Sequence, residues 1–437
     1  MKQRGAEGTA LGRIMVYTHN SIGLGHAVRT MALIDGMRRA APRIEWLVLS
    51  GTSAPGIFLD QGVELVRLPG IRRALDVPGR PFLPRRLGSF TIQEIVAWRR
   101  RIIEECRIHF NPDVIMIEHS PAGLMGEASP LLAARADRGA AGNGPVLIHL
   151  SRGILAASPR SAAGHDDHPE LPTGTNIASL FDALYVFDEK TTVDVNREFF
   201  GADPALEARI RYMGRISARN ADELTDVKGL PGSPWTGDKP FVLLALGRFG
   251  RIEDLHRRIL EACRKIGLDQ GREILVVPDV YLKPETVEAL KAQPAARGVR
   301  FAPFIPHLVD VMARADLVVC RAGYNMVNEV MLTGVRALIV PESHPSGEQE
   351  RRAASLSGPG LLVRSESACL CCDLESDLEE LMGHPLRPAS GEFDRFRIGR
   401  ALVEELEEML AGGGRKSGGA EKARSGPHPS SSSGALP

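Results

Sequence analysis

Short runs of Val, Ile and Leu recur along this chain of 437 residues in two series, and amphipathic stretches lie between many of them. Apolar runs of this length, bounded by turn residues, are typical of strands that are buried on both faces of a sheet. Because helices connect parallel strands, the alternation predicts an α/β fold with two parallel sheets. The predicted strands are 14–18, 44–50, 63–68, 114–118, 146–150 and 183–187 in the first series, and 241–246, 274–277, 299–302, 317–320 and 337–340 in the second.

A stretch rich in Gly, Pro and Asp, 219–240, separates the two series and is predicted to be an interdomain linker. On this division 12–218 forms a first Rossmann-like domain and 241–393 a second, with a cleft between them. An amphipathic helix is predicted at 394–411, and it could pack back across the first domain. The Gly- and Ser-rich end, 412–437, has no apolar face and is predicted to be disordered.

The bulk composition argues against several classes of protein. The formal net charge is zero, with 54 basic and 54 acidic residues, so no surplus of positive charge favours nucleic acid. No apolar run approaches the ~18 residues that span a bilayer, and the N-terminus lacks the apolar core of a signal peptide. These features predict a protein of the reducing cytosol. A peripheral contact with a membrane stays open, because 72–86 mixes Arg with Leu, Phe and Pro.

A glycine-containing turn follows the first strand of the first domain, where Gly23 and Gly25 precede a predicted helix. Glycine permits close approach of the backbone, and a helix N-terminus attracts anions. His26 lies in the first turn of that helix, where it could contact a reacting hydroxyl or a phosphate. The alternative is a tight turn whose histidine only caps or packs.

The second domain repeats this arrangement with Gly247, Arg248 and Gly250 directly after its first strand. Backbone amides there could hold a diphosphate, and arginines could neutralise its charge without a metal ion. A surface turn with solvated arginines is the alternative. Further along, the backbone of Ile305 could hydrogen-bond the edge of a base, although a proline-stiffened turn explains that segment equally well.

Loop, helix, strand and loop follow one another over 321–352, and ligands of open α/β sheets bind at such strand ends. Glu329 and Gln349 are placed where a nucleotide-sugar could lie between them. A carboxylate can accept two hydrogen bonds from the paired hydroxyls of a ribose. The segment therefore predicts a nucleotide site, with Arg321 at the start of its first loop.

Three residues at strand ends are candidates for a general base: His19, Glu118 and His119. Each taken alone is also explained as a polar loop residue. No metal site and no cofactor are predicted, because His165 and His168 lie in a long polar loop without further ligands, and the cysteines at 369–372 lack a partner cluster.

These motifs together resemble the GT-B glycosyltransferases of family 28, whose best-known member transfers N-acetylglucosamine onto lipid I. The resemblance rests on Gly-x-Gly-His-x-x-Arg at 23–29 and on Arg-Ala-Gly, Asn-Glu-Val, Gly-Val, Val-Pro and Glu-Gln within 321–352. Tyr-Thr-His-Asn at 17–20 and Phe-Asn-Pro-Asp at 110–113 are more closely similar to a bacterial group of predicted glycosyltransferases. The resemblance covers about 13–411.

The resemblance implies an inverting, metal-independent transfer of a hexosyl or N-acetylhexosaminyl group from a nucleotide-sugar, with UDP as the expected nucleotide. The acceptor is unknown. The implied site places Glu329 on the ribose, Gln349 and Glu348 on the donor sugar, Gly323 and Asn325 at the diphosphate, the Ile305 backbone on uracil and His26 near the acceptor or the phosphates.

The chain departs from the family at 247–251, where relatives carry a richer glycine run, and it lacks the acceptor-side glycine loops of the lipid I enzyme. Lipid I is therefore not the expected acceptor. Two other hypotheses for the function stay open. One is a UDP-sugar hydrolase of the pseudaminic-acid-pathway type, which the 22–29 segment also resembles, and the other is a non-catalytic GT-B scaffold. A UDP-sugar epimerase fits the second-domain motif less well.

Overall fold

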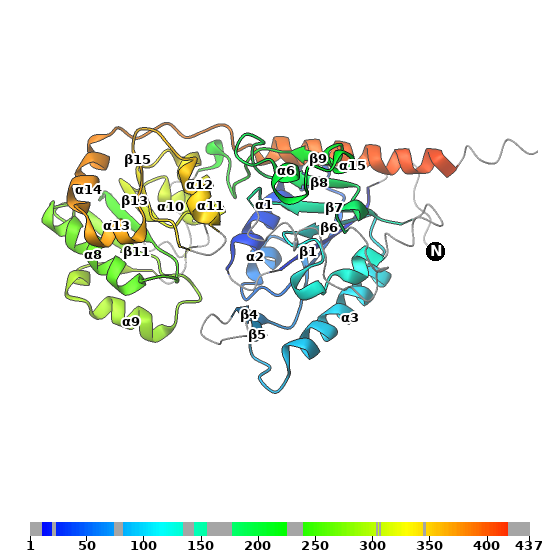
Figure 1. Cartoon of the computed structure of the whole chain (residues 1–437), viewed down its shortest axis with the longest axis horizontal. Coiled ribbons are helices and arrows are strands. Elements are labelled where there is room, and N and C mark those ends of the chain that lie inside the picture. The colour runs from blue at the N-terminus through cyan, green and yellow to red at the C-terminus, as the bar shows by residue number, and fades with distance from the viewer. Residues whose placement is uncertain are drawn as a thin grey trace, which may run out of the picture.

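The computed structural model describes residues 11–19, 23–73, 82–133, 144–154, 177–224, 239–302, 305, 307–343 and 347–417. Within them the chain forms two α/β domains that lie side by side (Figure 1). The predicted loop histidines 165 and 168, the middle of the linker and the end of the tail fall outside these residues.

The first domain is built on a parallel sheet of seven strands in the order β3-β2-β1-β6-β7-β8-β9. Successive residues of β1 point to opposite faces, because side chains alternate along a strand. Ile14 and Val16 join the core that contains α1, whereas Met15 and Tyr17 join the core on the other face. The strands are β1 (Arg13–Thr18), β2 (Glu45–Ser50), β3 (Glu64–Arg67), β6 (Val114–Glu118), β7 (Val146–Ser151), β8 (Ala183–Val186) and β9 (Ile210–Tyr212).

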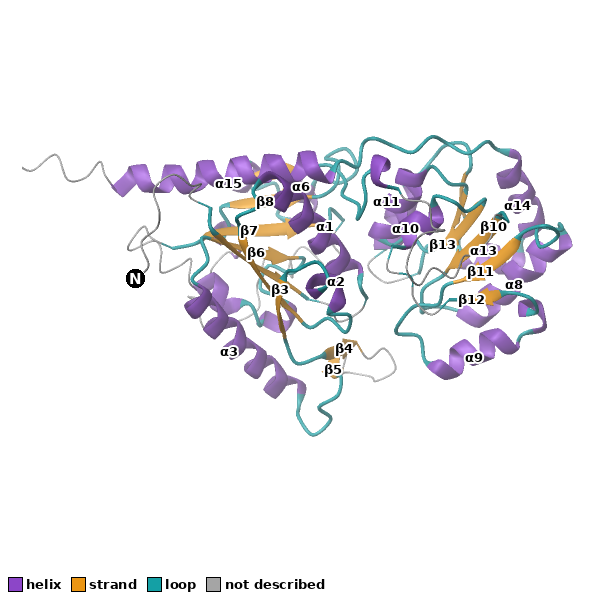
Figure 2. Cartoon of the chain, turned by 180° about the vertical axis from the view of Figure 1, so that it is seen from behind, coloured by secondary structure: helices purple, strands orange, loops and turns teal. Residues whose placement is uncertain are grey.

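Helices cover both faces of this sheet, as buried parallel strands require (Figure 2). They are α1 (Gly25–Ala40), α2 (Gly56–Leu59), α3 (Ile92–Phe110), α6 (Val195–Phe199) and α7 (Pro204–Glu207). A Thr91–Glu94 capping box fixes the start of α3. A small antiparallel hairpin, β4 (Ile71–Arg73) with β5 (Phe82–Pro84), lies outside the main sheet.

The second domain has a parallel sheet of six strands in the order β12-β11-β10-β13-β14-β15. Gly334, with φ of 68°, ends α11 in the left-handed conformation that the sequence predicts for this position. The strands are β10 (Phe241–Ala245), β11 (Glu273–Val276), β12 (Arg300–Phe301), β13 (Leu317–Cys320), β14 (Ala337–Ile339) and β15 (Leu361–Val363). The helices are α8 (Ile252–Lys265), α9 (Pro284–Ala292), α10 (Leu308–Met312), α11 (Tyr324–Thr333), α12 (Glu348–Ala354), α13 (Glu366–Cys371) and α14 (Leu374–Gly383).

The chain then returns as α15 (Arg395–Ser417), which lies over the first domain in Figure 1 and packs against α1. Ile398, Leu402, Val403 and Leu406 of α15 are buried in the same core as β1 and α1. Burying each such side chain contributes roughly 1.5–3 kcal/mol. The helix runs to Ser417, six residues beyond its predicted end at 411, so the structure corrects the prediction of disorder for 412–417.

Each sheet has a point where the strand order reverses, between β1 and β6 in the first domain and between β10 and β13 in the second. Ligands of open α/β sheets bind at the carboxyl ends of strands at such points. The strands missed by the sequence analysis are β4, β5, β9 and β15, each of three residues, which is too short for a clear apolar pattern.

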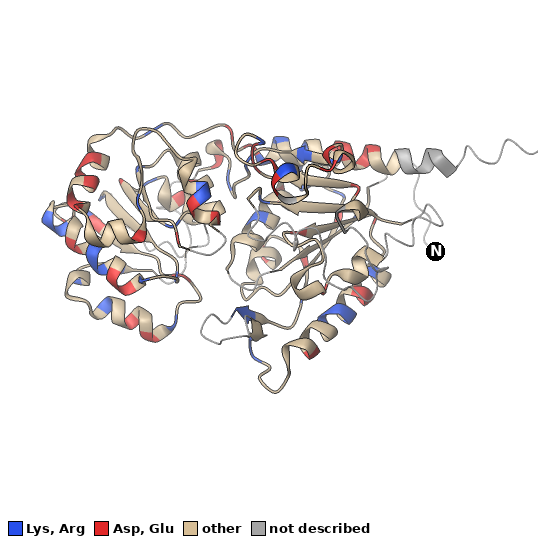
Figure 3. Cartoon of the chain, viewed as in Figure 1, with Lys and Arg blue, Asp and Glu red and all other residues tan. Residues whose placement is uncertain are grey.

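Charged residues of both signs are spread over the outer helices of both domains (Figure 3). No helix among the described residues is both long enough and apolar enough to cross a lipid bilayer.

Candidate nucleotide-sugar site between the domains

A cavity of about 890 Å³ lies between the two domains and is lined by residues that follow β1, β6 and β7 on one side and β10, β13 and β14 on the other. It therefore joins the two crevices that the strand orders predict. Most of the predicted site residues line it: Gly23, Gly25, His26, His119, Gly247, Ile305, Arg321, Gly323, Asn325, Glu329, Glu348 and Gln349.

His26 and Glu118 form a hydrogen-bonded pair at the first-domain end of the cavity. The Nδ1 atom of His26 lies 2.7 Å from one carboxylate oxygen of Glu118 and 2.9 Å from the other. Arg29 also pairs with this carboxylate, and the Thr18 hydroxyl lies 3.4 Å from it. A carboxylate accepts only, so Nδ1 of a neutral His26 carries the proton and Nε2 is the nitrogen left as a base.

Glu118 itself is 1% exposed and does not line the cavity. The prediction that its carboxylate faces the cleft is therefore wrong, because Glu118 lies behind His26 and is enclosed by its partners. It is a positioning residue for the imidazole.

Two more histidines lie beside His26. The ring centroids are 4.8 Å apart for His19 and His26, 5.2 Å for His19 and His119, and 5.0 Å for His26 and His119. Burial lowers the pKa of each of the three imidazoles well below 6.5, and neighbouring arginines lower it further. All three rings are therefore neutral near pH 7.

Two helix N-termini meet across the cavity. Asn325, in the first turn of α11, donates a hydrogen bond of 3.0 Å from its Nδ2 to the carbonyl of Gly25, the first residue of α1. Neither helix has a side-chain cap or an acidic residue in its first turn. The first amides of a helix have no partner within it and carry partial positive charge, so these two ends favour an anion between the domains.

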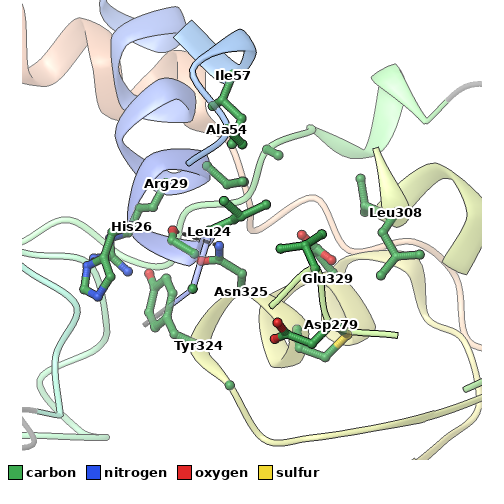
Figure 4. Close-up of a pocket in the computed structure, with 18 of the residues that line it drawn as sticks. Leu24, His26, Arg29, Ala54, Ile57, Asp279, Leu308, Tyr324, Asn325 and Glu329 are labelled. Carbon is green, nitrogen blue, oxygen red and sulfur yellow. Dashed lines mark hydrogen bonds between the residues drawn. The ribbon is translucent and has the colours of Figure 1, made fainter. Parts of the chain in front are cut away.

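Glu329 lies on α11 at the far side of Asn325 from His26 (Figure 4). Its side chain is 9% exposed and lines the cavity, and no group among the described residues hydrogen-bonds to its carboxylate. Burial, together with the negative charge of the nearby Asp310, raises the pKa of this carboxyl to about 8. Such a group is poised to accept hydrogen bonds from a ligand.

Glu348 and Gln349 begin α12 on the second-domain wall. Glu348 pairs with Arg152 of the first domain at 2.6 Å and with Arg352 at 2.7 Å. Burial raises the pKa of Glu348, but the two arginines outweigh it and hold the pKa below its ordinary value. The Gln349 amide exchanges two hydrogen bonds of 3.0 Å with Glu342.

Arg321 lines the cavity, but its guanidinium is used by the protein. It donates to the carbonyls of Leu246, Phe249 and Val340 and to the carboxylate of Glu366. These bonds tie together the ends of β10, β13 and β14. Arg321 therefore holds the loops that follow these strands in place.

The loop at 247–251 differs from its prediction. Arg248 and Gly250 do not line the cavity, because Arg248 lies 3.4 Å from Asp279 and stacks on Tyr281, whereas Gly250 lies against Glu366. Gly247 does line it, with φ of 69°. Arginine side chains from this loop therefore do not reach a ligand in this arrangement.

Sequence reasoning missed Arg152 and Tyr324. Arg152 directly follows β7, so the strand-end rule was the available signal. Tyr324 is buried, its hydroxyl donates to the carbonyl of Phe187 at 2.6 Å, and its ring lies under Arg29 at 5.2 Å. No local sequence pattern could have indicated that Tyr324 contacts residues of the first domain.

Solved structures share this fold. The glycotransferase of kitacinnamycin superposes with a TM-score of 0.53 at 16% identity, covering 93% of this chain and 98% of that one. A UDP-N-acetylglucosamine 2-epimerase superposes with a TM-score of 0.59 at 15% identity, covering 98% and 100%. Two parallel-sheet domains with the cavity at their facing strand ends define the GT-B class.

The sequence of the second domain gives a more specific comparison than the fold does. Residues 274–394 match the family model described as the glycosyltransferase family 28 C-terminal domain. This match, which is confined to the second domain, agrees with the resemblance to family 28 that the motifs within 321–352 carry.

The chain is also similar in sequence to curated glycosyltransferases. The UDP-N-acetylglucosamine--N-acetylmuramyl-(pentapeptide) pyrophosphoryl-undecaprenol N-acetylglucosamine transferase of Burkholderia cenocepacia is 39% identical over 98 residues, which are 21% of this chain and 27% of that protein. The transferase of the same name from a Nocardioides species is 26% identical over 362 residues, covering 78% and 82%. The chain spans only 27 to 32% of the length of several relatives that it matches.

Proposed function

We propose that this protein transfers a sugar from a nucleotide-sugar, with UDP as the nucleotide, to an acceptor that binds on the first-domain side of the cavity. The observation that carries the proposal is that Glu329, whose carboxyl has no hydrogen-bond partner among the described residues, lines one cavity with His26, which Glu118 holds through its Nδ1 atom. Relatives named as UDP-N-acetylglucosamine transferases support the donor class.

The donor is proposed to lie along α11. Glu329 would accept hydrogen bonds from the paired ribose hydroxyls, and the backbone of Ile305 would meet the base. The diphosphate would lie at Gly323 and Asn325, where the amide ends of α1 and α11 stabilise the charge that develops as the glycosidic bond breaks. No metal ion on the diphosphate is needed for this stabilisation.

The acceptor step is proposed to use His26 as general base. Glu118 holds the Nδ1–H of His26, so Nε2 can take the proton of the acceptor hydroxyl as that oxygen attacks the anomeric carbon. Attack from the face opposite the departing diphosphate gives inversion. Gln349 and Glu348 lie on the second-domain wall where the donor sugar would rest.

A nucleotide-sugar hydrolase or epimerase is the second candidate, because UDP-N-acetylglucosamine 2-epimerases share the fold over nearly the whole chain. Water in place of the acceptor hydroxyl would give hydrolysis with the same base. Release of free sugar in the absence of any acceptor, at a rate that added acceptors do not raise, would favour this second candidate.

The test is a thermal-shift screen of the full chain against UDP, GDP, dTDP, CDP and their sugar conjugates. A ligand that binds only the folded protein raises its stability by RT ln(1 + [L]/Kd). We expect UDP and one UDP-sugar to raise Tm, and Glu329→Ala to weaken that binding roughly 10- to 100-fold, since leaving buried hydrogen-bonding groups without their partner costs about 1–3 kcal/mol.

The matched control is Glu285→Ala, an exposed glutamate on α9 of the same domain, which should keep the wild-type response. An unchanged UDP response in Glu329→Ala would refute the ribose assignment. No response of the wild type to any nucleotide would refute the donor proposal.

A further inference from the structure

We propose that His19, His26 and His119 form a binding site for a divalent transition-metal ion, with Zn²⁺ the ion that best suits the ligands. Its fourth coordination position would open to the cavity. The inference goes beyond the proposed transfer and does not depend on it, and it departs from the expectation of no metal site that the sequence gives.

The three histidines come from three separate segments, after β1, in the first turn of α1 and after β6. One ligand nitrogen from each lies within 4.8 Å of the others. A tetrahedral ion ~2.1 Å from each nitrogen would hold three imidazole centroids roughly 5 Å apart. The centroid separations of 4.8, 5.0 and 5.2 Å match that spacing. The ligand nitrogens, within 4.8 Å of one another, would draw together to roughly 3.4 Å when an ion binds.

The nitrogens are available for coordination. The Nδ1 atoms of His19 and His119 are buried and have no hydrogen-bond partner among the described residues. A buried imidazole nitrogen without a partner is costly unless a ligand satisfies it. His26 keeps Nε2 for an ion, because its Nδ1 is held by Glu118 at 2.7 Å. A carboxylate behind a histidine is the usual second partner of a metal ligand.

The backbone around His119 is also specialised. Its φ of 72° is in the left-handed region, which costs a residue other than glycine about 1–2 kcal/mol. Two hydrogen bonds fix the His119 backbone there. The His119 amide donates to the carbonyl of Leu150 at 2.9 Å, and His149 Nε2 donates to the carbonyl of His119 at 3.0 Å. This conformation brings the His119 ring beside His19 and His26.

The arginines near the three rings are paired with carboxylates. Arg29 and Arg152 act on all three rings, and Arg99, which pairs with Glu127 at 2.6 Å, also acts on His19. Arg29 pairs with Glu118, and Arg152 pairs with Glu348 at 2.6 Å. Each positive charge is therefore offset by an adjacent carboxylate, and a divalent ion would meet three neutral imidazoles.

The ion would occupy His26 Nε2, the nitrogen that the proposed transfer gives to the acceptor hydroxyl. Metal binding and general-base action at His26 therefore exclude one another. The metal-loaded and the base-competent forms are two alternative states of one pocket.

The test uses the full chain prepared without a histidine tag and stripped with a chelator. Titration with Zn²⁺ followed by calorimetry, and with Co²⁺ followed by its d–d absorption, should give one ion per chain with the intense visible bands of tetrahedral Co²⁺. His19→Ala and His119→Ala should each weaken binding at least about tenfold, and Glu118→Gln about 10- to 100-fold through loss of the second partner.

His109→Ala, an exposed histidine on α3, is the matched control and should bind the ion as the wild type does. Circular dichroism checks that each variant is folded. The proposal is overturned if the wild type binds no ion, or if the affinity is the same in His19→Ala and His119→Ala as in His109→Ala. The UDP-induced rise in Tm, measured on the same proteins, separates this failure from failure of the donor proposal.

Discussion

At the scale of single residues, the site contains side chains whose pKa is shifted by burial. Glu329 is carried into the cavity wall by α11, and burial raises the pKa of its carboxyl to about 8 from an ordinary value of 4.5. The folded protein therefore keeps this group protonated between those two values, whereas the unfolded chain ionises it. The group's contribution to stability is complete below pH 4.5 and is lost as the pH rises through 8.

This linkage predicts the behaviour of Glu329→Gln, which mimics the protonated carboxyl. At pH 5 its free energy of unfolding should equal that of the wild type, and at pH 8.5 it should exceed it by ~1–3 kcal/mol. Urea unfolding at both pH values measures the difference, with Glu285→Gln as the exposed control. A stability difference that is the same at pH 5 and pH 8.5 would contradict the assigned pKa.

At the scale of elements, α1 presents His26 at its N-terminus and packs against α15 around Gly36. Gly36 of α1 and Gly399 of α15 bring the two backbones together, since a Cβ on either would collide with the backbone of the other helix. A backbone cannot give way as a flexible side chain can. The C-terminal helix thus fixes the position of the helix that carries the site.

Gly36→Ala should therefore destabilise the first domain by ~1–3 kcal/mol, the usual cost of overpacking, in spite of the better helix propensity of alanine. Gly383→Ala, in α14 with open space around it, is the matched control and should be neutral or slightly stabilising. Denaturant midpoints of the two variants measure this. Equal midpoints would mean that α1 and α15 shift apart without cost.

At the scale of the whole molecule, contacts hold the two domains closed around the cavity. Besides the Asn325–Gly25 bond, the Ser53 hydroxyl lies 2.5 Å from that of Tyr281, and Arg351 pairs with Glu198. The Arg152–Glu348 pair, with side chains 17% and 12% exposed, is more enclosed than the Arg351–Glu198 pair. A more enclosed pair is less screened by solvent and contributes more.

Arg152→Met should shift the molecule toward an open form. Loss of about 1–2 kcal/mol changes the ratio of the two forms by a factor of roughly 5–30. Small-angle scattering should report a larger radius of gyration for this variant than for wild type. Arg351→Met removes a more exposed pair, 43% and 32%, and should change the radius less. Equal radii for wild type and Arg152→Met would show that the pair does not control closure.

Local sequence patterns predict much of this architecture. The strands 14–18, 114–118 and 317–320 could be predicted because strands buried on both faces must be apolar throughout. Gly334 indicated a helix end because glycine adopts the left-handed conformation without steric cost. Gly23, Gly25, Asn325 and Glu329 were placed at the cavity for the same reason, since strand ends and helix starts are local features.

Other features depend on distances between segments far apart in sequence, which no local pattern encodes. Glu118 was expected to face the cleft, yet Arg29 and His26 enclose it, and Arg248 was expected on a phosphate, yet it reaches Asp279. The amino-acid sequence by itself determined the two sheets, their strand ends and the residue types gathered there, because periodicity and turn chemistry are local. Only the tertiary structure decided which of those side chains meet, above all the three histidines, because their separation is set by strand order and domain packing.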